Sequence, residues 1–235
     1  MRLPDKSQRL VVIGKTGEGK STVGLYFLCQ MDWDETPYVF VDIKGDDLFA
    51  KILKACGKTI KRIDYNTVPT KGGLYYLKVD MFDMEGLEQW LVKVYQQGNV
   101  GLFIDEGYAI PKMSKAFTAI LTQGRAKNIP VIVLYQRPVY MSKFAIAQAD
   151  FFVCLNQNMQ SDKELTYEYV PLDLDYKGHR INVLTTLPRY CFLYYDVAES
   201  EIQFFKPVPH PNNIVKMFKD RLKPAPQSNR LRIYI

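Results

Sequence analysis

The most chemically specific segment of the sequence covers residues 14–22. Its members are Gly14, Lys15, Thr16, Gly17, Glu18, Gly19, Lys20, Ser21 and Thr22. The first eight match the pattern G-x-x-x-x-G-K-[ST], in which glycines let backbone N–H groups surround phosphate oxygens. In this pattern Lys20 reaches the β- and γ-phosphates of a nucleoside triphosphate, and the Ser21 hydroxyl ligates Mg²⁺. The segment therefore predicts a phosphate-binding loop, or P-loop.

Glu18 is an unusual residue for this loop because its carboxylate would stand near a polyanion. We expect its side chain to point outward, with Lys15 offsetting its charge.

Two adjacent acids, Asp105 and Glu106, follow the apolar run of residues 100–104. Successive residues of a strand point in opposite directions, so the two carboxylates can serve different partners. We expect Asp105 to hold the Mg²⁺ shell and Glu106 to face the water that attacks the γ-phosphate. Residues 38–43 form another predicted strand between the P-loop and the acids. This arrangement favours a motor-type ATPase over a kinase or a GTPase.

Continuous apolar runs, typical of strands buried on both faces, are separated along the chain by segments of helical periodicity. This order predicts a mostly parallel sheet covered by helices on both faces. The predicted strands are residues 9–13, 38–43, 61–65, 100–104, 130–135 and 151–155, and the predicted helices are 21–30, 46–55, 87–95 and 114–123. Residues 66–80 are expected to form a loop or a loose hairpin. Residues 181–185 and 190–197 are expected to form a C-terminal antiparallel strand pair.

Residues 121–138, LTQGRAKNIPVIVLYQRP, are the most distinctive stretch of the sequence. With YVFVDIKGD at residues 38–46, they resemble the FtsK–HerA superfamily of DNA-pumping P-loop ATPases, and the resemblance covers roughly residues 9–155. It implies a RecA-like core of the additional-strand, catalytic-glutamate (ASCE) type that uses ATP. It also implies that Gln136 is a polar sensor near the γ-phosphate.

The resemblance further implies that Arg125 is an arginine finger, delivered to the nucleotide of a neighbouring subunit in a ring. A guanidinium at the γ-phosphate stabilises the charge of phosphoryl transfer. Arg137 is an equally available candidate for the finger.

The shortness of the sequence on both sides of the motifs leads us to expect a bare motor domain. Such a domain is similar to the genome-packaging ATPases of tailless viruses and phages with internal membranes, the tectivirus group. This resemblance implies a homo-oligomeric ring, with a hexamer favoured, that moves double-stranded DNA without sequence preference. It also implies a capsid vertex protein as a partner, and a location in the host-cell cytoplasm or at the packaging vertex of the virion.

The formal net charge of +6 lies entirely in the last thirty of the 235 residues, which contain seven basic residues and one acid. This asymmetry excludes a uniformly basic nucleic-acid coat. We expect one ATPase domain at residues 1–205 and a basic extension at residues 206–235, which could contact DNA, a neighbouring subunit or the capsid. The four cysteines are scattered, so we expect reduced thiols. No apolar run is long enough to cross a bilayer.

Three other functions remain open from the sequence. An ATPase of filamentous-phage assembly or conjugative DNA transfer would share the motifs, although such proteins usually carry a membrane segment. A small P-loop metabolite kinase would need a lid with several arginines and would leave Glu106 without a water to activate. A nucleotide-gated scaffold would hydrolyse ATP slowly or not at all.

Overall fold

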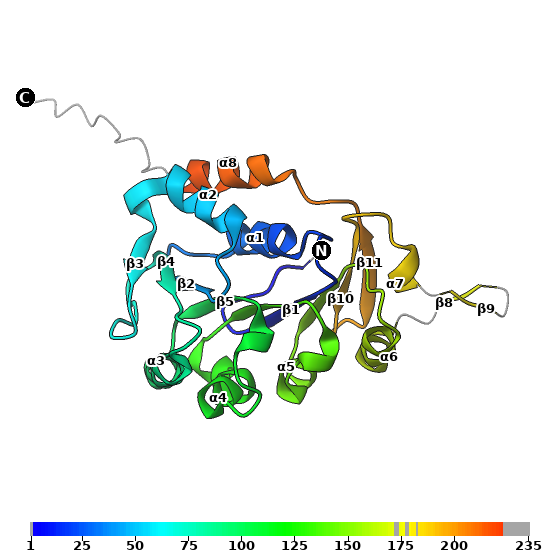
Figure 1. Cartoon of the computed structure of the whole chain (residues 1–235), viewed down its shortest axis with the longest axis horizontal. Helices are drawn as coiled ribbons and strands as arrows, with labels where there is room; N and C mark the ends of the chain where they lie inside the picture. Colours follow the sequence, from blue (N-terminus) through cyan, green and yellow to red (C-terminus); the bar gives the residue numbers. More distant parts are fainter. Residues whose placement is uncertain (1, 172–173, 177–178, 182, 223–235) are drawn as a thin grey trace, which may run out of the picture.

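A nine-stranded sheet forms the centre of the computed structural model, which describes residues 2–171, 174–176, 179–181 and 183–222 (Figure 1). The strand order is β11-β10-β7-β1-β6-β5-β2-β4-β3. The strands are β1 (Arg9–Ile13), β2 (Pro37–Asp42), β3 (Lys61–Ile63), β4 (Gly73–Lys78), β5 (Gly101–Asp105), β6 (Val131–Tyr135), β7 (Phe151–Cys154), β10 (Phe192–Asp196) and β11 (Glu201–Phe205). A separate two-stranded antiparallel sheet contains β8 (Leu174–Tyr176) and β9 (His179–Ile181).

The seven strands from β7 to β3 in this order are parallel, and β10 and β11 extend the sheet in antiparallel fashion. Strand β6 lies between β1, which precedes the P-loop, and β5, which ends in the acid pair. This inserted strand defines the predicted additional-strand arrangement, so the fold prediction is confirmed. Because the carboxyl ends of parallel strands meet at one edge, the motifs that follow β1, β5 and β6 share that edge.

Helices cover both faces of the sheet, as Figure 1 shows. One layer contains α1 (Lys20–Gln30), α2 (Asp47–Cys56) and α8 (Pro211–Arg221). The other contains α3 (Met84–Gln97), α4 (Lys115–Gln123), α5 (Lys143–Ala147) and α6 (Gln160–Tyr169), and a single turn, α7 (Val183–Thr186), precedes β10. The inner strands are buried along their whole length because both faces pack on helices. No helix in the described part of the chain has the length and apolar character needed to span a membrane.

One segment that was expected to be a loop belongs to the central sheet. Residues 66–80 contain β4, which pairs in parallel with both β2 and β3, so the prediction of a loop or loose hairpin was wrong. The central residues of β4 are buried because α2 and α3 cover its two faces. The polar segment after β7 contains α6, in which Thr166 is fully buried.

The C-terminal antiparallel pair is present, but its members differ from the prediction. Strand β10 pairs with β7 and with β11, which follows it after a short turn. Residues 183–185, predicted to be part of a strand, belong to the helical turn α7. A hairpin between neighbouring strands needs only a short connection, which explains why β11 is the partner of β10.

The segment after residue 205 also differs from the expected surface extension, because α8 packs against α1 and α2. Ile214 and Phe218 of α8 are fully buried, and the Phe218 ring stacks on Trp33 with 5.3 Å between centroids. The guanidinium of Arg221 lies 4.1 Å from the Trp33 ring centroid. Helix α8 therefore packs on the domain that precedes it. The basic residues after Leu222 lie outside the described residues.

Candidate active site

The P-loop connects β1 to α1 at the carboxyl edge of the sheet. Gly17 and Gly19 have φ angles of 84° and 90°, in the left-handed region that favours glycine. A Cβ atom on Gly14 would lie 2.7 Å from Cβ of Leu155, so only glycine fits there without a shift. No side chain caps the N-terminus of α1. Its first N–H groups can therefore bind the oxygens of a phosphate.

Lys20 is held at the mouth of this loop. Its ammonium group donates a hydrogen bond of 3.2 Å to the carbonyl oxygen of Lys15, and 9% of the residue is exposed. Burial lowers the pKa of Lys20, while the charges of Glu106 and Asp105 act to raise it. Both acids at the end of β5 thus lie close enough to the P-loop lysine to affect its charge.

Asp105 and Glu106 are buried at the end of β5. Burial, together with the charges of Asp46 and Glu106, raises the pKa of Asp105 to about 7. Glu106 adopts a left-handed conformation with φ of 68°, which is uncommon outside glycine and concentrates at functional sites. The backbone therefore leaves the strand at Glu106, and strand alternation alone does not set the direction of this side chain.

A chain of side-chain hydrogen bonds connects the P-loop to Glu106. The Thr16 hydroxyl donates to Oε1 of Gln136 over 3.0 Å, and the Gln136 amide donates to Oε1 of Glu106. Lys44, which follows β2, donates to the same Glu106 oxygen over 2.9 Å. The other oxygen, Oε2 of Glu106, is buried and has no hydrogen-bond partner. Three motifs that are far apart in the sequence are thus in direct contact.

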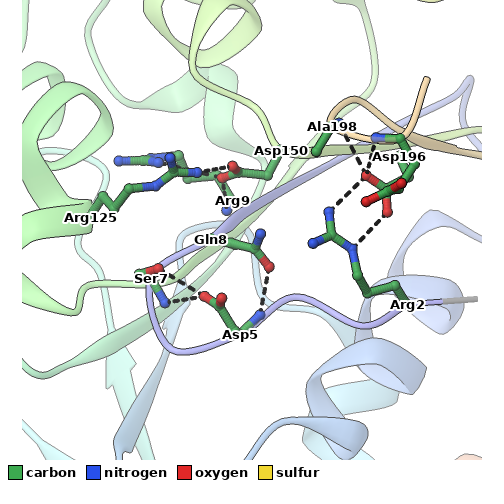
Figure 2. Close-up of polar contacts among 10 residues, drawn as sticks. Arg2, Asp5, Ser7, Gln8, Arg9, Arg125, Asp150, Asp196 and Ala198 are labelled. Atoms are coloured by element: carbon green, nitrogen blue, oxygen red, sulfur yellow. Dashed lines mark hydrogen bonds and ion pairs between the residues drawn. The ribbon is translucent and has the colours of Figure 1, made fainter. Parts of the chain in front are cut away.

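Arg125 lies at the amino-terminal ends of the parallel strands, opposite the edge that carries the P-loop. It precedes β6 in a 3₁₀ turn (Gly124–Lys127), and its guanidinium forms an ion pair with Asp150. Asp150 also accepts a hydrogen bond of 2.9 Å from the backbone N–H of Arg9, the first residue of β1 (Figure 2). The length of β1, about 15 Å for five residues, separates this cluster from the P-loop. Arg125 therefore does not reach the P-loop of its own chain.

Arg137, the second candidate for the finger, lies on the P-loop edge because it directly follows Gln136. It donates a hydrogen bond of 3.0 Å to Asp162 of α6, and its guanidinium lies 5.1 Å from the ring centroid of Tyr140.

The outward orientation expected for Glu18 was wrong, although the ion pair with Lys15 is present at 3.5 Å. Glu18 is 7% exposed and accepts a hydrogen bond of 3.2 Å from Asn156. Sequence reasoning did not single out Asn156 or Lys44. Lys44 lies inside the quoted YVFVDIKGD segment and could have been noticed there, whereas no local pattern marks Asn156.

Two oxygen groups beside the P-loop could bind a cation, the hydroxyl of Ser21 and the carboxylate of Asp105. Mg²⁺ prefers oxygen ligands of this kind. Within the described ranges, no group of three or more His, Cys, Asp or Glu side chains could hold a metal ion by itself. The four cysteines are free thiols, as expected.

Comparison with known proteins places the chain among viral packaging ATPases. No protein-family model matches the sequence. The DNA packaging ATPase P9 of Enterobacteria phage PRD1 is 36% identical over 220 residues, which cover 93% of this chain and 95% of that protein.

Among solved structures, the genome packaging NTPase B204 of Sulfolobus turreted icosahedral virus 2, in complex with AMPPCP, has a similar fold. Its TM-score is 0.66 at 19% identity, with 87% of this chain and all of that chain covered. The pCW3 conjugation coupling protein TcpA has a TM-score of 0.56 at 16% identity, over 90% of this chain and 65% of that chain. The chain belongs to the family of the PRD1 DNA packaging ATPase P9, which confirms the resemblance identified from its motifs.

Proposed function

We propose that this protein is an ATPase that uses hydrolysis to move double-stranded DNA into a preformed viral capsid. The observation that best supports ATP hydrolysis is the series of hydrogen bonds from Thr16 through Gln136 to Glu106 beside the P-loop. The observation that supports DNA as the substrate is the 36% identity to a DNA packaging ATPase.

The P-loop residues 14–22 bind the phosphates of ATP through backbone N–H groups, and Lys20 neutralises the β- and γ-phosphates. The Ser21 hydroxyl and the Asp105 carboxylate would hold Mg²⁺ when it binds together with ATP. The pKa of Asp105 is raised first by burial and then by the charges of Asp46 and Glu106, and a bound cation would stabilise its ionised form. When bound, Mg²⁺ offsets the negative charge that develops on the phosphate oxygens.

Glu106 acts as the general base on the attacking water. Its unpartnered oxygen Oε2 is buried and can accept a proton, while Oε1 is held by Lys44 and Gln136. Gln136 forms hydrogen bonds with both the P-loop and Glu106. A contact of its amide with the γ-phosphate can therefore change the position of the general base.

Arg125 acts as an arginine finger in trans, within a ring for which a hexamer is favoured. Its position at the sheet edge opposite the P-loop means that it can serve only the nucleotide of another subunit. Its side chain is 60% exposed despite the ion pair with Asp150, so a neighbouring subunit can approach it. Arg137 is the weaker candidate because Asp162 holds it beside the P-loop of its own chain.

We further infer that DNA is bound without sequence preference, mainly through phosphate contacts. Lys216 and Lys219 on the exposed side of α8, with the basic residues that follow, are candidate contacts to DNA or to a capsid vertex protein. We keep residues 1–205 as the ATPase domain of this proposal and 206–235 as the basic segment, with α8 docked on the domain. Packaging would take place in the host-cell cytoplasm, at the vertex of the capsid.

Steady-state phosphate release, with and without double-stranded DNA, tests this function. We expect release of phosphate from ATP alone and a higher rate with DNA, and no release by a Lys20→Ala variant. Unchanged rates on addition of DNA would contradict the translocase. Release that requires a second phosphate acceptor would support the metabolite kinase instead.

A further inference from the structure

The loop between α7 and β10 (residues 187–191) lies directly against the P-loop. A Cβ atom on Gly19 would come within 3.3 Å of Cδ1 of Tyr190, so the tyrosine ring touches the P-loop backbone. Gly19 immediately precedes Lys20, the first residue of α1. The ring of Tyr190 therefore stands next to the helix N-terminus at which the proposed phosphate site is built.

Asn156 connects this loop to the P-loop through hydrogen bonds. Its side-chain amide donates to Oε2 of Glu18 over 3.2 Å and to the carbonyl oxygen of Leu187 over 2.9 Å. The backbone carbonyl oxygen of Asn156 accepts a hydrogen bond of 2.9 Å from the backbone N–H of Lys15. The position of the 187–191 loop relative to the P-loop is thus fixed by partly buried hydrogen bonds. This arrangement also gives the Glu18 carboxylate a structural role, which the proposed hydrolysis does not give it.

Tyr190 has a left-handed backbone conformation. Its φ angle is 65°, in the left-handed region that a bulky residue rarely adopts, within a turn closed by a 3.0 Å hydrogen bond from Cys191 to Pro188. Such strain persists where the surrounding structure enforces it, and it concentrates at ligand sites. Despite this constraint the residue is 41% exposed. The loop therefore presents part of an aromatic ring to solvent beside the P-loop.

Arg189 adds a cation to this ring. Its guanidinium carbon lies 4.8 Å from the ring centroid of Tyr190, within the range of a cation–π contact. Arg189 is itself exposed, so an aromatic ring and a guanidinium plane are both offered at the same place.

The strand order indicates which end of the nucleotide would meet this loop. Gln136 and Glu106 lie on the β6 and β5 side of β1, and they mark the γ-phosphate end. The 187–191 loop leads into β10, which lies on the other side of β1, beyond β7. A nucleotide whose triphosphate crosses the P-loop from the β6 side would direct its base toward Tyr190.

We propose that Tyr190 is the platform on which the base of a purine nucleoside triphosphate stacks, with Arg189 flanking it. This inference rests on the proposed ATP site and adds the contact that recognises the base. Stacking of a base on an aromatic side chain contributes about 1–3 kcal/mol. Such a contact distinguishes a nucleotide from a bare polyphosphate, and the larger purine ring overlaps the tyrosine more than a pyrimidine does.

Calorimetric titration of the full chain with two ligands tests the platform. The ligands are the non-hydrolysable ATP analogue AMPPCP and inorganic tripolyphosphate, both with Mg²⁺ and without DNA. Tyr190→Ala should weaken AMPPCP binding about 5- to 150-fold and leave tripolyphosphate binding unchanged. Tyr190→Phe should keep the affinity for AMPPCP. Phe204→Ala, which removes an exposed aromatic from β11, should change neither affinity.

Two outcomes would overturn the platform. Unchanged AMPPCP binding by Tyr190→Ala would show that the base does not contact this ring. Equal loss of both ligands would show that Tyr190 only supports the P-loop backbone at Gly19. Because the titration contains no DNA and no turnover, a failure of DNA to stimulate hydrolysis would reject the translocase and leave this result standing.

Discussion

Lys44 donates a 2.9 Å hydrogen bond from Nζ to Oε1 of Glu106, and it thereby places an ammonium group beside the buried carboxylate that directly follows β5. The hydrogen bond and the charge of Glu106 raise the pKa of Lys44 above its ordinary value. Lys44 therefore stays protonated at neutral pH. It reaches Glu106 from the loop after β2, so a residue of the DIKGD segment orients the proposed general base.

Replacing Lys44 should reduce turnover without removing the nucleotide site. Lys44→Ala leaves the Glu106 carboxylate with Gln136 as its one remaining partner on Oε1, so we expect kcat to fall about tenfold with little change in KM. Lys44→Arg should restore most of the rate, and Lys51→Ala, an exposed lysine of α2, serves as the control. Steady-state kinetics would check this. Faster hydrolysis by Lys44→Ala would mean that Lys44 restrains the base instead of orienting it.

Glu106→Gln should separate binding from hydrolysis. The amide keeps the size of the side chain and its contacts on Oε1, but it cannot accept a proton from water. We expect ATP affinity within a few-fold of the original protein and kcat lower by about 10²–10⁴-fold. Equilibrium binding and phosphate release, measured on one preparation, would check both quantities. Residual activity close to that of the unaltered chain would assign the base to another residue.

Arg125→Ala should remove hydrolysis in a way that another subunit can repair. Arg125 lies beside Asp150 at the sheet edge away from the P-loop, so its loss should lower kcat about 10³–10⁵-fold only through a neighbour. Mixing Arg125→Ala with Lys20→Ala should restore activity, because about a quarter of the interfaces in a randomly mixed ring join an intact P-loop to an intact finger. The matched control is Arg137→Ala mixed with the same partner. Recovery with Arg137→Ala and not with Arg125→Ala would transfer the finger role.

Short motifs and the strands that carry them could be predicted from the sequence, because their signals are local. The P-loop, the acid pair and most of the inner strands are formed by contiguous residues, and the apolar runs identify strands that are covered on both faces. Strand β4 was missed because Pro69 and two glycines in the same segment are typical of loops. Its strand conformation depends on pairing with β2 and β3, which are distant in sequence.

The parts of the site that the sequence did not reveal depend on tertiary contacts. The left-handed conformation of Glu106 follows from no propensity of glutamate, and the hydrogen bonds of Asn156 join segments that no periodicity connects. The same limit applies to α8. Its high content of charged and polar residues predicted an extension, whereas Ile214 and Phe218 give it a buried face.

Asp105 should make the stability of the nucleotide-free protein depend on pH. Its pKa is about 7 in the folded chain and near its ordinary value of 3.8 in the unfolded chain, so between these values the folded state binds more protons. The free energy of unfolding should therefore fall as pH rises from about 4 to about 7 and level off above that range. Asp105→Asn should remove this slope and stabilise the protein at pH 8 by roughly 2–4 kcal/mol.

Urea denaturation of both proteins in EDTA would check the pH prediction, with Asp34→Asn, an exposed acid before β2, as the control. Parallel stability curves for the Asp105→Asn and unaltered proteins would show that Asp105 is ionised throughout.

Phe218→Ala should destabilise the whole ATPase body, because α8 is packed on it. The Phe218 ring is fully buried against Trp33, so its removal leaves a cavity between α8 and the body. We expect a loss of about 3–5 kcal/mol in the free energy of unfolding. Lys219→Ala, on the exposed side of the same helix, should change it by less than about 0.5 kcal/mol. A single urea transition whose midpoint is lower for Phe218→Ala would show that α8 unfolds together with the rest of the domain. An unchanged midpoint would show that residues 211–221 unfold separately from it.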